Sequence, residues 1–285
     1  MQKINFYILP IADFSNVEKD ILQIEEVCTK IIDNSDTISL TDEFFSPDCN
    51  GNTIFNKLNS NSTSKFIVQY FSKFGTNSFD DIDMDDYHNQ FIEIDNTHKI
   101  DKKSIVRTVK GLISCYQTNA YCLQDFSELF DWKRKCFPQL LFTEDSFGNK
   151  RKAFSINSSN PDFSDLYKQT VKCLSILNNQ TKELVLLNTS ERILALQAKL
   201  PKEISCSGKG RNEKGNFKKK VFVKDKVPTD INCHPHFKLI RGDSDYRIYF
   251  SWENEKIQSQ TFIIAKIGSH WNDKDDSALS EIKIT

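Results

Sequence analysis

The sequence predicts an α+β protein in which a helical N-terminal region precedes a small antiparallel sheet braced by two helices. Two observations lead to this prediction. Apolar residues recur with the 3.6-residue period of amphipathic helices in much of the chain before residue 200. From residue 217 the period changes toward 2, which is typical of strands. A chain of 285 residues is long for one compact domain, so we expect two, at 1–133 and 134–285.

The N-terminal region is predicted to be mainly helical. It begins with a short strand at 4–9, followed by a helix at 17–32 whose apolar residues fall on one face. Residues 34–64 are polar and rich in turn-forming residues. Further helices are predicted at 53–58, 65–74, 102–120 and 123–136.

The second domain is predicted to open with a strand at 137–142, which is entered through a proline. A polar connection leads to two helices, 162–177 and 189–200. Ser190 is the residue type that caps helices, and we expect it to cap the second of them. These two helices are the ones expected to brace the sheet.

Three strand-like runs follow at 234–241, 246–252 and 262–268. The first two are separated by the turn-forming residues 242–245, so we expect them to pair as an antiparallel hairpin. Alternation then places four polar side chains on one surface: His236, Lys238, Arg247 and Tyr249. The apolar side chains that face the helices would be Phe237, Leu239, Ile248 and Phe250.

The eight cysteines are scattered and form no CxxC pair, which indicates reduced, mostly buried thiols. Cys206, Cys233, His236 and His270 are residue types that ligate zinc, but a closed zinc site usually offers two close pairs and this set offers one. The acidic run at 80–86 lacks the glycine and the glutamate of an EF-hand loop. We expect His88 and His98 nearby to be surface or packing residues. We therefore expect neither a metal nor a cofactor.

Charge is unevenly distributed along the chain. Residues 1–200 hold 22 basic and 27 acidic side chains, whereas 201–285 hold 16 basic and 12 acidic ones. The densest basic segment, 202–226, has nine Lys or Arg. It is interpreted either as a nucleic-acid contact or as a solvated, mobile loop. The candidate nucleic-acid-binding residues are Lys209, Arg211, Lys218, Lys219 and Lys220 in this segment, and Lys266 beyond it.

The sequence contains no uninterrupted apolar run of about 18 residues, and its first residues lack the apolar region of a secretion signal. These features predict a soluble, cytoplasmic protein without a membrane partner.

The predicted order of one strand, two helices and three strands is similar to that of the RelE/ParE-type toxin fold. The specific part of the resemblance is 246–248 (Tyr-Arg-Ile) and 266–270 (Lys-Ile-Gly-Ser-His). RelE-like members cleave RNA, often messenger RNA on the ribosome, with basic residues and a Tyr or His in place of a metal. This chain departs from the pattern by inserting Ser269 and by carrying a long basic insertion at 201–226. Some relatives act on topoisomerase instead, so the fold alone leaves the reaction open.

Metal-independent RNA cleavage needs a base, an acid and cations around the phosphate. We expect Arg247 and Lys238 to supply charge, His270 or His236 to transfer protons, and Tyr249 to orient or stack on a base.

Three interpretations remain. The first is a toxin-like ribonuclease in a bacterial defence or stress system, whose expected partners are RNA or the ribosome and a protein partner or antitoxin. The second is a non-catalytic module that binds nucleic acid or protein. The third is a structural subunit of a larger assembly, in which the basic loop docks against an acidic neighbour.

Overall fold

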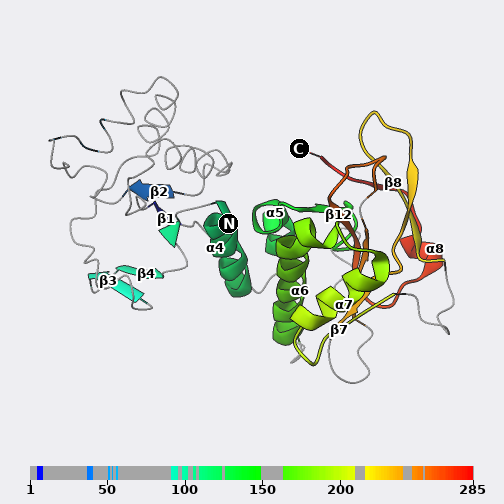
Figure 1. Cartoon of the computed structure of the whole chain (residues 1–285), viewed down its shortest axis with the longest axis horizontal. Helices are drawn as coiled ribbons and strands as arrows, with labels where there is room; N and C mark the ends of the chain where they lie inside the picture. The colour runs from blue at the N-terminus through cyan, green and yellow to red at the C-terminus, as the bar shows by residue number, and fades with distance from the viewer. Residues whose placement is uncertain are drawn as a thin grey trace. The chain divides into compact units, whose positions relative to one another are not determined.

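A computed structural model provides the structure of the protein. It describes residues 5–8, 37–40, 51, 53, 56, 91–95, 98–101, 105–106, 109–123, 126–148, 163–208, 216–239, 246–252 and 254–284. The chain divides into two compact units, Met1–Asn119 and Ala120–Thr285 (Figure 1). This division falls inside a helix, as does the predicted boundary at 133/134 in the next helix along the chain. The two units are described separately.

Apart from Gly51, Thr53 and Asn56, the described residues before Val109 form strands. Asn56 is helical, and it and Thr53 are the described residues of the helix predicted at 53–58. The strand predicted at 4–9 is confirmed as β1 (Asn5–Ile8). It lies between β2 (Thr37–Leu40) and β5 (Ile105–Val106) in a parallel three-stranded sheet. Strands β3 (Phe91–Asp95) and β4 (His98–Asp101) form an antiparallel hairpin.

The sequence prediction differs from the structure in this unit. The helix predicted at 102–120 begins only at Val109, as α4 (Val109–Leu123), because the β-branched pair Ile105 and Val106 joins β1 instead. Strand β2 falls in a stretch predicted to be polar and turn-rich. The helices predicted at 17–32 and 65–74, and the acidic run at 80–86 with His88, lie outside the described residues.

The second unit contains the helices α5 (Phe126–Cys136), α6 (Phe163–Leu184), α7 (Thr189–Lys199) and α8 (Asp273–Asp276). The helix prediction for α5, α6 and α7 is confirmed, although α6 is one to two turns longer than predicted. The predicted cap of α7 is wrong. Asn188 is the N-cap: its side chain accepts from the Glu191 amide at 3.1 Å, and its own amide donates to the Glu191 carboxylate at 3.0 Å. Ser190 lies one residue inside the helix.

The main sheet of this unit has five strands in the order β6-β12-β11-β10-β7. The strands are β6 (Leu140–Phe142), β7 (Ser205–Ser207), β10 (His236–Lys238), β11 (Arg247–Ser251) and β12 (Phe262–Gly268). Neighbouring strands are antiparallel except that β6 runs parallel to β12. The α+β class is therefore confirmed, while the sheet is mixed where the sequence predicted an antiparallel one.

A second sheet covers part of the first. It comprises β8 (Lys218–Phe222), β9 (Thr229–Asn232) and β13 (Ser280–Glu281), in the order β13-β8-β9. Helices α5, α6 and α7 lie on one side of the five-stranded sheet, and the second sheet and α8 lie on the other (Figure 1). On the helix side, the Arg192 guanidinium of α7 lies 5.3 Å from the ring of Trp252. Between the sheets lies a core of Phe217, Val221, Ile231, Cys233, Tyr249, Ile257, Ile263, Ala265, Trp271 and Ile282.

The five cysteines whose side chains are described are free and buried: Cys115, Cys136, Cys173, Cys206 and Cys233. Burial raises the pKa of Cys206 to about 12 and raises the pKa of Cys136, Cys173 and Cys233 further. These thiols therefore stay protonated and unreactive near neutral pH, as the scattered cysteine pattern predicts.

None of the helices in the described ranges has the length and apolar content needed to cross a membrane.

Candidate functional site

The register of the β10/β11 hairpin brings the predicted site residues to one face of the sheet. His236 lies opposite Tyr249, and Lys238 lies opposite Arg247. The intervening pair, Phe237 and Ile248, points to the other face because side chains alternate along a strand. This is the arrangement that the alternating sequence predicts.

The neighbouring strands extend these pairs into two rows, which together we call the polar face. The first row is Ser207, His236, Tyr249 and Lys266, and the second is Ser205, Lys238, Arg247 and Gly268. Since adjacent strands lie about 4.8 Å apart, each row extends over roughly 14 Å. A β-bulge in β12 follows the Tyr249–Lys266 pair, so that Ala265 and Lys266 together oppose Tyr249.

Tyr249 lies between His236 and Lys266 in the first row of the polar face and is 0% exposed. Its ring stacks on Phe217 at a centroid distance of 5.8 Å and meets Trp271 edge-on at 5.3 Å. Its hydroxyl oxygen accepts a hydrogen bond from the Trp271 amide at 3.0 Å and one from Arg247 Nη1 at 3.3 Å. Tyr249 therefore holds Arg247 and the segment after β12 in place. The predicted stacking of Tyr249 on a base is wrong for this structure, because protein side chains cover the ring.

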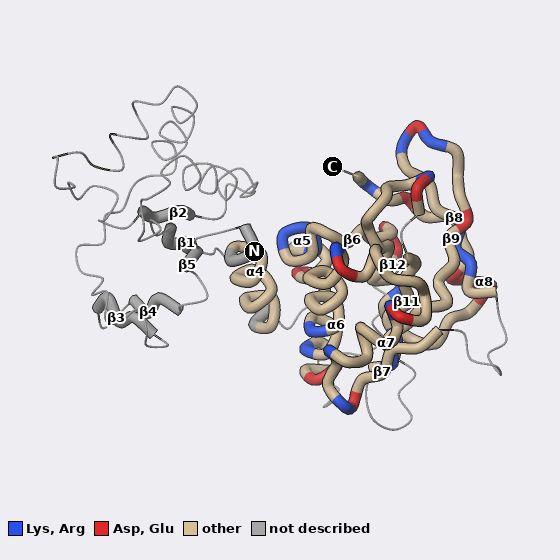
Figure 2. The backbone as a smooth tube through the Cα atoms, in the orientation of Figure 1, with Lys and Arg blue, Asp and Glu red and all other residues tan. Residues whose placement is uncertain are grey.

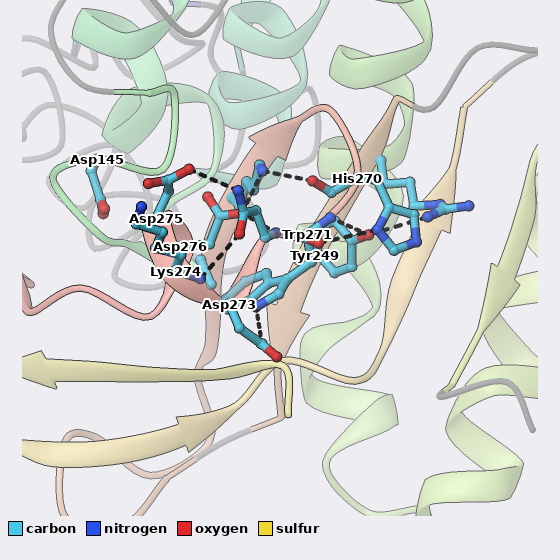
Figure 3. Close-up of polar contacts among 12 residues, drawn as sticks. Asp145, Tyr249, His270, Trp271, Asp273, Lys274, Asp275 and Asp276 are labelled. Carbon is cyan, nitrogen blue, oxygen red and sulfur yellow. Dashed lines mark hydrogen bonds and ion pairs between the residues drawn. The ribbon is translucent and has the colours of Figure 1, made fainter. Parts of the chain in front are cut away.

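His270 lies in the segment that Tyr249 holds. Its ring centroid is 6.5 Å from that of Tyr249, and its Nδ1 lies 3.1 Å from the Trp271 carbonyl oxygen (Figure 3). A carbonyl oxygen only accepts, so Nδ1 carries a proton and Nε2 is the basic nitrogen of the neutral ring. Both His270 and Arg247 lie beside Tyr249, so the two groups share one side of the sheet. Both are partly exposed.

Lys238 and Arg247 are the two cations of the polar face. Cβ atoms of directly opposed residues lie about 5 Å apart, and like charges in such a pair repel. Both side chains are partly exposed, and within the described part of the chain neither forms an ion pair with a carboxylate. An anion bound between them would relieve this repulsion.

Lys266 and Lys219 do not belong to an accessible cationic surface. Lys266 Nζ lies 2.6 Å from an Asp276 carboxylate oxygen and donates to the His270 carbonyl at 3.0 Å (Figure 3). Lys219 is 1% exposed, and its Nζ lies 2.6 Å from an Asp145 carboxylate oxygen. The structure thus corrects the prediction that these two lysines contact nucleic acid, because each is neutralised inside the protein.

The remaining predicted nucleic-acid-binding residues fall into two groups. Lys218 and Lys220 flank Lys219 on β8, and alternation along the strand leaves both exposed. Figure 2 marks the lysine and arginine positions of the described chain in blue along the backbone. Lys209 and Arg211 lie outside the described residues. Lys218 and Lys220 therefore remain available for a charged partner.

Three aspartates organise the segment after β12. Asp273 accepts a hydrogen bond from Trp271 Nε1 at 3.0 Å, and Asp276 accepts one from the Asn272 amide at 2.6 Å (Figure 3). Asp275 accepts one from the Asn272 side chain at 2.8 Å. These carboxylates act as local hydrogen-bond acceptors that fix the position of His270.

His236 belongs to the first row of the polar face and is 1% exposed. Its Nδ1 lies 2.9 Å from the His234 carbonyl oxygen, and its Nε2 lies 3.1 Å from Ser207 Oγ. The sequence prediction did not select Ser207. The signal for it was the alternation Ser205-Cys206-Ser207, which marks a strand with a polar face but does not identify its neighbour.

The zinc set considered from the sequence is not brought together. Cys206 lies opposite Phe237, so its side chain points to the helix side, whereas His236 belongs to the polar face. These two residues cannot bind one ion. In the part of the chain that the structure describes, no group of three or more His, Cys, Asp or Glu side chains is placed to hold a metal ion.

Comparison of this chain with protein-family models, curated proteins and solved structures finds no match.

Proposed function

We propose that the polar face binds the sugar-phosphate backbone of RNA, and that the protein is a toxin-like, metal-independent ribonuclease or an RNA-binding effector. The observation that carries this proposal is the opposed pair Lys238 and Arg247, which has no carboxylate partner in the described chain. Arg247 donates to the hydroxyl of Tyr249, and the ring of Tyr249 neighbours that of His270. Two cations at this spacing suit a phosphodiester, which carries its charge on adjacent oxygens.

In the proposed reaction, Lys238 and Arg247 bind the phosphate and stabilise the charge that develops on it. His270 Nε2 takes the proton of the attacking 2′-hydroxyl or returns one to the leaving 5′-oxygen. Tyr249 acts as a positioning residue, because its hydroxyl contacts both Arg247 and the backbone beside His270. The resemblance to RelE-like toxins is consistent with these roles and remains a prediction.

A second candidate is an RNA-binding protein without cleavage activity. One specific observation favours it: His236 and Tyr249 are both buried, which removes two of the five predicted catalytic side chains from contact with substrate. Among those five, His270 is then the one partly exposed imidazole, whereas cleavage needs both a base and an acid. The proposed partners are RNA or the ribosome for the polar face, and a protein partner or antitoxin for the rest of the chain.

Binding of labelled single-stranded RNA at several salt concentrations tests the shared part of both candidates. Arg247→Ala should weaken binding and reduce the slope of log affinity against log salt by about 0.7, the value for one lost contact to a single strand. Lys238→Ala should act similarly. Lys182→Ala is the matched control, since it removes an equal charge from the exposed side of α6. Equal binding by Arg247→Ala and Lys182→Ala would refute the proposal.

Cleavage assays in EDTA separate the two candidates. Cutting by the wild-type protein that is lost in His270→Ala, while RNA binding is retained, supports the ribonuclease. Binding without cutting supports the non-catalytic effector.

A further inference from the structure

We propose that Ser207 is a nucleophilic hydroxyl activated by His236, and that the pair attacks phosphorus in an anionic phosphoric ester. This assigns a covalent step to residues other than the RNA-binding cations, and it does not require RNA to be the ligand.

The hydrogen bonds of His236 fix which nitrogen is basic. The His234 carbonyl oxygen, 2.9 Å from Nδ1, accepts only, so Nδ1 carries the proton. In the neutral imidazole, Nε2 then presents its lone pair to Ser207 Oγ at 3.1 Å, and the Ser207 hydroxyl is the donor. A hydroxyl donating to an imidazole whose other nitrogen is oriented by a third group is the arrangement that activates serine nucleophiles. Here a backbone carbonyl takes the place of the usual carboxylate.

The fold places this pair where a substrate can reach the serine while the imidazole stays protected. Ser207 is partly exposed at the end of β7, which is an edge strand of the five-stranded sheet. His236 lies on the next strand in direct register with it and is buried against the Tyr249 ring, 5.2 Å away. Packing on that side restricts the imidazole to the rotamer that faces Ser207.

The charge beside the pair indicates the substrate class. Lys238 is two residues beyond His236 on β10, so it is the diagonal neighbour of Ser207. Diagonal Cβ atoms lie about 7–8 Å apart, a distance that a lysine side chain spans. An ammonium at this position neutralises an anionic ester oxygen and would stabilise the charge that develops on phosphorus.

Ser207 Oγ forms a bond to phosphorus, the bond from phosphorus to the leaving oxygen breaks, and the hydroxyl proton moves to His236 Nε2. The leaving oxygen, opposite Ser207 across phosphorus, takes a proton from water, while His236 keeps the hydroxyl proton. Water or hydroxide later attacks the phosphoseryl adduct from that opposite side, the bond from phosphorus to Ser207 Oγ breaks, and His236 Nε2 returns its proton to Oγ.

A fluorophosphonate probe tests the proposal on the full-length protein, because it reports the same attack with fluoride as the leaving group. Mass spectrometry of the folded wild-type protein should show one adduct, mapped to Ser207. Ser207→Ala should abolish labelling. Ser190→Ala is the matched control, since it removes an exposed hydroxyl on α7, outside the polar face, and should label normally. His236→Phe, which conserves the ring volume, should slow labelling by about 10²-fold or more.

Circular dichroism melting curves establish that each variant is folded. Peptide mapping of the wild-type adduct needs no variant, so the proposal remains testable even if His236→Phe unfolds. Absence of an adduct on the folded wild-type protein would overturn the proposal. So would an adduct on another residue, or labelling of Ser207 no faster than in urea-unfolded protein.

Discussion

Lys219→Met tests whether an internal ion pair holds the basic strand β8 in place. Lys219 Nζ lies 2.6 Å from Asp145 Oδ2 and donates to the Asp276 carbonyl at 3.1 Å. Only 2% of the lysine side chain is exposed. Methionine keeps the length and the apolar stem but removes the ammonium. The Asp145 carboxylate would then keep its hydrogen bond from Ser280 and lose its counter-charge.

The expected loss of stability follows from the burial of the two partners. Removing one member of a fully buried ion pair costs about 3–5 kcal/mol. The Asp145 side chain is 21% exposed, so water solvates part of the orphaned charge and we expect a loss near the lower limit, about 3 kcal/mol. In units of about 150–250 residues, 1 kcal/mol corresponds to about 2–4 °C, so the midpoint of thermal unfolding should fall by roughly 6–12 °C.

Thermal unfolding followed by far-ultraviolet circular dichroism measures this change. Lys218→Met and Lys220→Met make the same chemical change at the two exposed neighbours on β8, and each should alter stability by less than about 0.5 kcal/mol. If Lys219→Met melts together with these controls, the ion pair contributes no stability and the reasoning is refuted.

Two further predictions concern the helices. Asn188→Ala removes the side-chain oxygen that accepts from the Glu191 amide at the start of α7, while the backbone amide of residue 188 can still donate to the Glu191 carboxylate. It should cost about 1 kcal/mol in urea unfolding, whereas Ser190→Ala should stay within about 0.5 kcal/mol; equal losses would contradict the assignment of the cap. Burial lowers the pKa of Lys133 from 10.5 to about 8, so above pH 8 the unfolded chain binds more protons and the stability of the wild type rises with pH. Lys133→Met has no charge to bury at this position, so its stability advantage over the wild type should be largest at about pH 7 and should shrink toward about pH 10. An advantage that does not change with pH would refute the effect of burial.

The hairpin at the centre of the candidate site could be predicted because local pattern determines it. The alternation in 234–241 and 246–252, with turn-forming residues between the runs, allows one register in which apolar side chains share a face. The placement of His236 opposite Tyr249 and of Lys238 opposite Arg247 follows directly. A slip of one residue would have moved every apolar side chain to the polar face.

The covering of that face could not be predicted, because it depends on tertiary packing between distant segments. A polar alternating face is usually solvated, yet Phe217 and Trp271 pack over Tyr249 and bury it. The run 218–220 shows the same limit. Three consecutive lysines appear equally exposed in the sequence, whereas strand geometry turns the middle one inward to a carboxylate 74 residues away.

The parallel strand pairings could not be predicted either, because they also join segments that are distant in the sequence. Strand β6 joins β12, and Ile105 and Val106 join β1 across about a hundred residues. Local periodicity carries no information about such contacts.

The backbone at Phe217 has a consequence for the basic residues that precede it. Phe217 adopts a φ of 43°, a conformation that residues other than glycine rarely adopt. Its ring stacks on the ring of Tyr249. Nine residues before Asn216, strand β7 ends at Ser207, which belongs to the same cross-strand row as Tyr249. The described residues on either side of the intervening segment, Ser207 and Phe217, therefore both lie at this row. The basic residues that the sequence has between these two ends, Lys209, Arg211 and Lys214, are thus covalently joined to the candidate site on both sides.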